Sequence, residues 1–337
     1  MKKEEEKLFN LIKLKLSKKV SFIDEIADVL DLSYDAAYRR IKGKTTLNLA
    51  ETLKLSNHYN INLNTLLVEA KNDVQKIIVQ KTHNVISDNF LHIFFEESVK
   101  EIEKLLESKE SKLINSLKDY PLYHAGDGYF SKFRIYALIN MSSSDVTIKT
   151  LPFSEFNPST EVLKKYHTFL SKYEKVSLVE IWSDSTIDNI LNQIQYFFDI
   201  GLISKEESLE ISDSLVDSLS SIEQQAKNQK RNKSENSYHL YHNNLVSLLN
   251  TVLMQTKTNK KVFVPYTNLS YFKVSDENTT NQFEQHLKTQ LEFSKNHSGD
   301  AAVDRKKFFN TLYQKIENLK TKISASFLQN NFSNSIL

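Results

Sequence analysis

Glycine and proline are scarce in this chain, and their scarcity constrains the fold more than any other feature of the sequence. The 337 residues contain only 5 glycines and 4 prolines. Folds that are dense in tight turns, such as β-sandwiches, need these residues at their turns, and Gly-rich phosphate-binding folds need glycine beside the ligand. The sequence therefore predicts a mainly α-helical protein. Its length exceeds one average domain and predicts two or three folding units.

The composition excludes several other classes of protein. Apolar residues make up 40% of the chain and aromatic residues 11%, which suits a packed core rather than a disordered chain. The chain has no cysteine, which excludes disulfide scaffolds, zinc fingers and thiol catalysis, and fits a reducing cytoplasm. No apolar run approaches the ~18 to 20 residues of a membrane span, and no apolar segment follows the basic start as in a signal peptide. With a net charge of only +2, any surface that binds nucleic acid must be local.

The segment 23–44 has the pattern of a helix-turn-helix. The small residue Ala27 stands where two helices must cross closely, and the apolar Leu32 stands in the turn between them. Ser33 is a good N-cap for the second helix, which is expected to end at Gly43. These local signals predict two short helices joined by a tight turn.

The second of these helices presents two different faces on a helical wheel. Tyr34, Ala37 and Ile41 share the face that is predicted to pack against the first helix. The opposite face presents the candidate base-reading residues, which are Asp35, Ala36 and Arg39, with Arg40 on its flank. Arginine can donate two hydrogen bonds to guanine, and aspartate can accept one from cytosine. The candidate phosphate contacts, which would fix position rather than sequence, are Ser33, Lys42, Lys44, Thr45 and Thr46. The alternative is a helical hairpin whose basic residues are merely solvated.

The chain resembles the Cro/C1-type (XRE-like) helix-turn-helix family of transcription regulators in four segments, 22–33, 37–44, 49–55 and 61–67. The resemblance implies a five-helix, lambda-repressor-like domain that binds DNA. The residue pattern itself places Leu49, Leu53 and Tyr59 on a fourth helix and begins a short fifth helix at Asn62, in agreement with this layout.

Two residues depart from this family's pattern. Asp31 stands in the turn where the family commonly has glycine, and aspartate tolerates the left-handed conformation at some cost. Arg40 stands where the family has an apolar residue on the second helix, and Ile41 takes over that apolar role.

The full chain also resembles a group of bacterial regulators that have an uncharacterised helical C-terminal region. The similar segments are 120–124, 180–182 and 308–310. This second resemblance implies no activity.

Three regions are expected along the chain. Residues 1–70 form the helix-turn-helix domain, residues 71–118 form long connecting or dimerisation helices, and residues 119–337 form a helical domain for sensing or oligomerisation. A small antiparallel β-hairpin or sheet is predicted near 250–265, around a polar turn at 257–260.

No constellation of catalytic, metal-binding or cofactor-binding residues can be assembled from the sequence. His239 and His242 have the spacing of a metal-binding pair, but no cysteine or acidic residue stands at ligand spacing, so a surface or packing role is favoured. Trp182 is expected to anchor a core rather than to stack on a ligand, and the basic segment 227–233 to be a solvated linker rather than a phosphate contact. We therefore predict that the protein is not an enzyme and needs no metal or cofactor.

The sequence as a whole predicts a sequence-specific transcription regulator that binds double-stranded DNA in the cytoplasm, associated with the nucleoid. We expect a homodimer, because one module of this size buries too little surface for strong sequence discrimination. The C-terminal region would sense a peptide, a small molecule or a protein effector, and no membrane contact is expected. The alternative is a helical protein-interaction adaptor that has lost DNA binding.

Overall fold

The computed structural model describes residues 3–16, 21–59, 61, 63, 66, 77–82, 90–108 and 110–334, without the side chains of residues 326–334. The chain divides into two compact units, Met1–Ile78 and Val79–Leu337. Within the described ranges, no helix has the length and the apolar character that crossing a membrane requires.

The N-terminal unit is helical. Its described helices are α1 (Lys3–Lys15), α2 (Phe22–Leu30), α3 (Tyr34–Ile41) and α4 (Leu49–His58). They enclose a small core made of residues from all four helices and from the segment after α4: Leu8, Phe9, Ile12, Ile26, Ala27, Leu30, Ala37, Leu55, Tyr59, Ile61 and Leu66. The predicted fifth helix at 62–67 falls mostly outside the described residues.

The turn between α2 and α3 closes without glycine. Asp31 adopts the left-handed conformation with φ of 54°, and the Leu32 amide donates to the Ala27 carbonyl at 2.9 Å. Ser33 then caps α3, because its hydroxyl oxygen accepts a hydrogen bond from the Ala36 amide at 3.4 Å. Ala27 of α2 and Ala37 of α3 are both buried in the same core, and their small side chains let the two helices pack closely.

The predicted fold class is wrong for the C-terminal unit, which contains a mixed eight-stranded sheet rather than a small hairpin. The strands lie in the order β1-β7-β6-β5-β2-β3-β4-β8. They are β1 (Gln80–Lys81), β2 (Lys112–Ser116), β3 (Ser177–Trp182), β4 (Tyr238–His242), β5 (Thr251–Gln255), β6 (Lys260–Pro265), β7 (Tyr271–Val274) and β8 (Lys295–Asn296). The central strands β2, β3 and β4 run parallel, and the other pairings are antiparallel. The predicted hairpin near 250–265 corresponds to β5 and β6 alone.

Two physical reasons explain why the sequence did not predict this sheet. The parallel strands β2 and β3 are short and largely buried on both faces, so they lack the alternation of apolar and polar residues that marks a half-buried strand. They are also joined by helices instead of tight turns, and helical crossovers do not need glycine and proline. Few glycines therefore exclude a turn-dense sheet, but not a sheet with parallel central strands.

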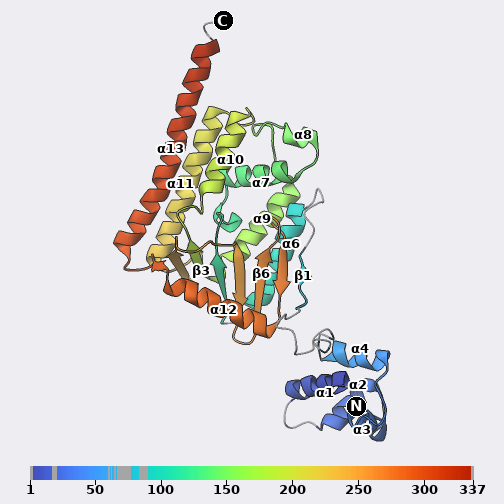
Figure 1. Ribbon diagram of the computed structural model, residues 1–337. Coiled ribbons are helices and arrows are strands. Elements are labelled where there is room, and N and C mark those ends of the chain that lie inside the picture. Colours follow the sequence, from blue (N-terminus) through green and yellow to red (C-terminus); the bar gives the residue numbers. More distant parts are fainter. Residues whose placement is uncertain are drawn as a thin grey trace. The chain divides into compact units, whose positions relative to one another are not determined.

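The helices of this unit are α6 (Phe90–Leu106), η1 (Leu122–His124), α7 (Tyr129–Ser142), α8 (Val146–Lys149), α9 (Thr160–Tyr173), α10 (Asp188–Asp199), α11 (Lys205–Asn228), α12 (Glu277–Glu292) and α13 (Ala302–Asn334). In Figure 1 the long α13 runs along α11, and the two helices contact each other. The region expected to form connecting helices, 71–118, holds β1, α6 and β2 among its described residues.

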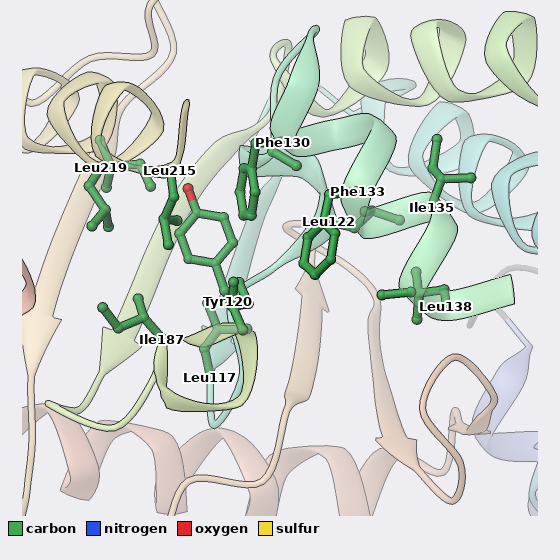
Figure 2. Close-up of a cluster of buried hydrophobic side chains, with 14 of the residues drawn as sticks. Leu117, Tyr120, Leu122, Phe130, Phe133, Ile135, Leu138, Ile187, Leu215 and Leu219 are labelled. Atoms are coloured by element: carbon green, nitrogen blue, oxygen red, sulfur yellow. The ribbon is translucent and has the colours of Figure 1, made fainter. Parts of the chain in front are cut away.

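The sheet separates two cores. On one face, Leu113 and Leu178 join the large core formed with α7, α9, α10, α11 and α13. On the other face, Ile114 and Ile181 join a smaller core with Leu287 of α12. Figure 2 shows Tyr120 inside the large core, between the phenylalanines of α7 and the leucines of α11. Asn115 follows Ile114 in β2 and Glu180 precedes Ile181 in β3, so both polar residues face the large core, as Leu113 and Leu178 do.

Candidate nucleic-acid interface

The outward face of α3 carries most of the predicted base-reading residues. Asp35 and Arg39 are exposed, and Ala36 is half-buried. Tyr34, which was expected to pack against α2, is instead 51% exposed, and Tyr38 one turn later is exposed as well. Ala37 is fully buried and Ile41 is partly buried, so these two residues form the inward face.

The side chain of Arg40, unlike that of its neighbour Arg39, forms an ion pair with Glu51 of α4. Its Nη2 atom lies 2.7 Å from Glu51 Oε1, its Nε atom donates to the same oxygen at 2.9 Å, and its Nη1 atom donates to the Ala36 carbonyl at 3.1 Å. The Arg40 side chain is only 17% exposed. The hydrogen bond with Glu51 raises the pKa of Arg40, and the same bond lowers the pKa of Glu51.

Glu51 also takes part in capping α4. Its Oε2 atom accepts a hydrogen bond from the Asn48 amide at 3.0 Å, while Asn48 Oδ1 accepts one from the Glu51 amide at 2.8 Å. This reciprocal capping box fixes the carboxylate that receives Arg40. Arg40 therefore fastens α3 to the start of α4, whereas Arg39 forms no ion pair with any residue that the structure describes.

The predicted phosphate contacts surround the end of α3. Lys42 and Lys44 place their Nζ atoms 5.8 and 6.0 Å from the centre of the Tyr38 ring. The Lys44 and Thr45 amides both donate to the Arg39 carbonyl, at 2.8 and 3.2 Å, which folds the chain back against the helix end. Thr45 and Thr46 are exposed like the two lysines, and Ser33 stands at the other end of α3 as its cap.

Two aromatic residues of this surface were not identified as candidates from the sequence. Tyr34 and Tyr38 are four residues apart and therefore lie on one stripe of the helix. Their spacing was visible in the sequence, but an aromatic residue at helical spacing is more often part of a core. Only the position of α2 shows that this stripe is exposed.

The other candidate sites receive structural roles. The part of the chain that the structure describes contains no cluster of three histidines or acidic residues suited to a metal ion. Trp182 is fully buried, as expected of a core anchor. The basic segment 227–233 is not simply a solvated linker, because Arg231 is buried and lies 3.3 Å from Glu174.

A family model described as the BetR domain matches residues 13–98. The match begins within α1, includes α2, α3 and α4, and reaches into α6 of the second unit. Comparisons with curated proteins and with solved structures find no match to this chain.

Proposed function

We propose that the protein is a sequence-specific DNA-binding transcription regulator that inserts α3 into the major groove. The observation that carries this proposal is the exposed, basic and aromatic face of α3. Arg39 and Tyr38 are exposed, and Lys42 and Lys44 flank the helix end without an ion pair to any described residue. A helix of this kind presents donors to base edges and phosphates at the same time.

The proposal assigns different roles to the two arginines. Arg39 is the candidate for reading a base, and Arg40 is the residue that fixes α3 on α4 through Glu51. Lys42, Lys44 and the two threonines that follow would contact phosphates and set the register of the helix on DNA.

We further propose that the regulator acts as a homodimer on a pseudo-palindromic site in the cytoplasm, on the nucleoid. Two copies would read half-sites about one helical turn apart. The second unit would sense a ligand or partner and alter the DNA affinity of the first.

The alternative function is a protein-interaction adaptor. The observation that favours it is the exposed apolar pair Leu49 and Leu53, which lie one turn apart on α4 with exposed fractions of 73% and 44%. Such a stripe suits contact with another protein surface rather than with a phosphate backbone.

The test is selection of bound duplexes from a random pool, followed by measurement of affinity against salt concentration. Arg39→Ala is expected to weaken binding of the selected site by about 1–3 kcal/mol, which is roughly 5-fold to 150-fold. Arg40→Ala is expected to lower the stability of the N-terminal unit as well, because it leaves Glu51 without its partner. Lys164→Ala, which removes one exposed charge from α9, is the matched control.

The outcomes separate the two functions. Recovery of a two-fold symmetric site, weakened by Arg39→Ala and unchanged by Lys164→Ala, supports the regulator. Negligible affinity for all duplexes even at low salt, or an unchanged affinity and salt slope in Arg39→Ala, contradicts DNA reading by α3 and favours the adaptor.

A further inference from the structure

A cavity of about 230 Å³ lies in the C-terminal unit, beside the carboxyl end of β2. Its lining includes Asn115 of β2 and the residues that follow this strand, together with side chains of α7, α9 and α10. Figure 2 shows three of its apolar lining residues, Tyr120, Leu122 and Leu138. A second cavity of about 240 Å³ shares Tyr173, Val252 and Tyr271 with it and continues along the sheet.

Arg134 of α7 lines the first cavity as a buried cation without a carboxylate partner. It is only 8% exposed, and among the described residues no acidic group lies within ion-pair distance of it. Its Nη1 atom donates to Gln193 Oε1 at 3.2 Å and its Nη2 atom to the Tyr120 carbonyl at 3.3 Å, whereas its Nε atom has no hydrogen-bond partner. Burial lowers the pKa of Arg134, as expected for a charge in a poorly solvated place.

Asp119 also lines the cavity, and its charge acts on Arg134 from beyond ion-pair distance. Its two carboxylate oxygens are already engaged, because they accept hydrogen bonds from the side-chain amides of Asn189 and Asn250. A buried charge normally has a close counter-charge. An anion in the cavity would supply the close counter-charge that Arg134 lacks.

The cavity also offers an unpaired acceptor and flat apolar walls. Asn115 is completely buried, and while its Nδ2 atom donates to the Tyr123 hydroxyl at 2.5 Å, its Oδ1 atom has no partner. The rings of Tyr123 and Tyr173 are stacked, with centres 4.3 Å apart and planes 13° from parallel. Phe169 lies beside them in the lining. Walls of this kind fit a planar ring better than a flexible chain.

We propose that this cavity binds a small aromatic carboxylic acid, with its carboxylate on Arg134 and its ring against the aromatic side chains. The charge on Arg134 selects an anion and is the feature that binding depends on. The free oxygen of Asn115 accepts a hydrogen bond from a donor on the ring where the ligand carries one, and binding does not require it. Binding at this site does not require that the protein binds DNA, so a failure of the DNA proposal leaves this one intact.

The test compares benzoate with benzamide, which has nearly the same shape and no charge, using the full-length protein without DNA. Calorimetry measures the affinities, and the fluorescence of Trp182, the only tryptophan, reports on the site. Its ring lies against that of Tyr120, with centres 5.6 Å apart, and Tyr120 lines the cavity. We expect saturable binding of benzoate that is at least about tenfold tighter than that of benzamide.

Variants of Arg134 assign this preference to its charge. Arg134→Met removes the charge and is expected to abolish the preference for benzoate, while Arg134→Lys keeps the charge and loses the planar fork, so it should retain a weakened preference. Lys132→Met, on the same helix but outside the cavity lining, is the control and should bind benzoate as the unaltered protein does.

Three results would overturn the proposal: no saturable binding of benzoate, equal affinity for benzoate and benzamide, or unchanged benzoate binding in a folded Arg134→Met protein. The first two are measured on the unaltered protein, so the test remains decisive even where a variant does not fold.

Discussion

Glu180 of β3 is a buried carboxylate whose removal should destabilise the C-terminal unit strongly. It is completely buried. Its Oε2 atom accepts hydrogen bonds from the Tyr238 hydroxyl at 2.6 Å and from Trp182 Nε1 at 3.1 Å, and His124 Nε2 lies 2.9 Å from it. Its Oε1 atom accepts from the Tyr123 hydroxyl. Burial alone would raise the pKa of Glu180, but the charge of His124 and these hydrogen bonds outweigh burial and lower the pKa.

Glu180→Gln preserves the shape of this side chain and removes half of its capacity to accept hydrogen bonds. A carboxamide has only one acceptor oxygen. Its NH₂ group replaces the second carboxylate oxygen and cannot accept the hydrogen bonds that this oxygen received. Each unsatisfied buried polar group costs about 1–3 kcal/mol, and breaking a buried charge pair costs about 3–5 kcal/mol. We expect a loss of about 3–5 kcal/mol, which for a unit of this size lowers Tm by roughly 10 °C.

Trp182 makes the assay specific for this cluster, because it is the only tryptophan and donates to Glu180 itself. Thermal unfolding followed by tryptophan fluorescence therefore reports on the C-terminal unit. Glu155→Gln, which alters an exposed carboxylate, is the matched control and should leave Tm unchanged.

The pH dependence provides a second check on the same variant. Because the pKa of Glu180 is lowered in the folded protein, its contribution is present above the ordinary carboxyl pKa of about 4.3 and is lost as the pH falls through the folded value. The difference between the two proteins should therefore shrink in acid. A fall in Tm of less than about 2 °C at neutral pH would refute the reasoning, because it would mean that the carboxylate contributes under about 1 kcal/mol.

Three further predictions follow from other parts of the molecule. Burial lowers the pKa of His297 from 6.5 to about 4, so the free energy of unfolding should fall by up to about 3 kcal/mol between pH 6.5 and 4. Urea unfolding of His297→Asn should show a flatter pH dependence over this range. Asp31→Gly should raise the stability of the N-terminal unit by about 0.5–1 kcal/mol in thermal unfolding, because glycine adopts φ of 54° without strain; a lower Tm would contradict this. Glu101→Gln should lower the urea midpoint of the C-terminal unit, because the half-buried Glu101 of α6 pairs with Lys261 of β6 at 2.8 Å and Lys273 of β7 at 3.1 Å; an unchanged midpoint would show that these pairs contribute little.

Local signals in the sequence predicted the positions of α2, α3 and the turn between them correctly. Ser33 as a cap and the small Ala27 act within a few residues of the helices they specify, and α2 and α3 lie where these signals predicted. The role of Arg40 could not be read in the same way. It depends on Glu51, eleven residues further along the chain, and on the position that the core gives to α4.

The Glu180 cluster shows the same limit over longer distances. Segments 120–124 and 180–182 are two of those that resemble bacterial regulators in sequence. They meet in the structure, where His124 and Trp182 both contact Glu180. Tyr238 joins them from β4, 58 residues beyond Glu180. Nothing in the sequence near any one of these residues indicates the others.

The sequence by itself determined the helices of the N-terminal unit, the turn between α2 and α3, and the residue types on the face proposed to meet DNA. These features depend on periodicity, capping and turn conformation, which act over a few residues. The tertiary structure decided the eight-stranded sheet, the separation of Arg39 from Arg40, and the cavity around Arg134. These depend on strands 112–116, 177–182 and 238–242 finding one another, because pairing and burial are properties of surfaces that distant segments build together.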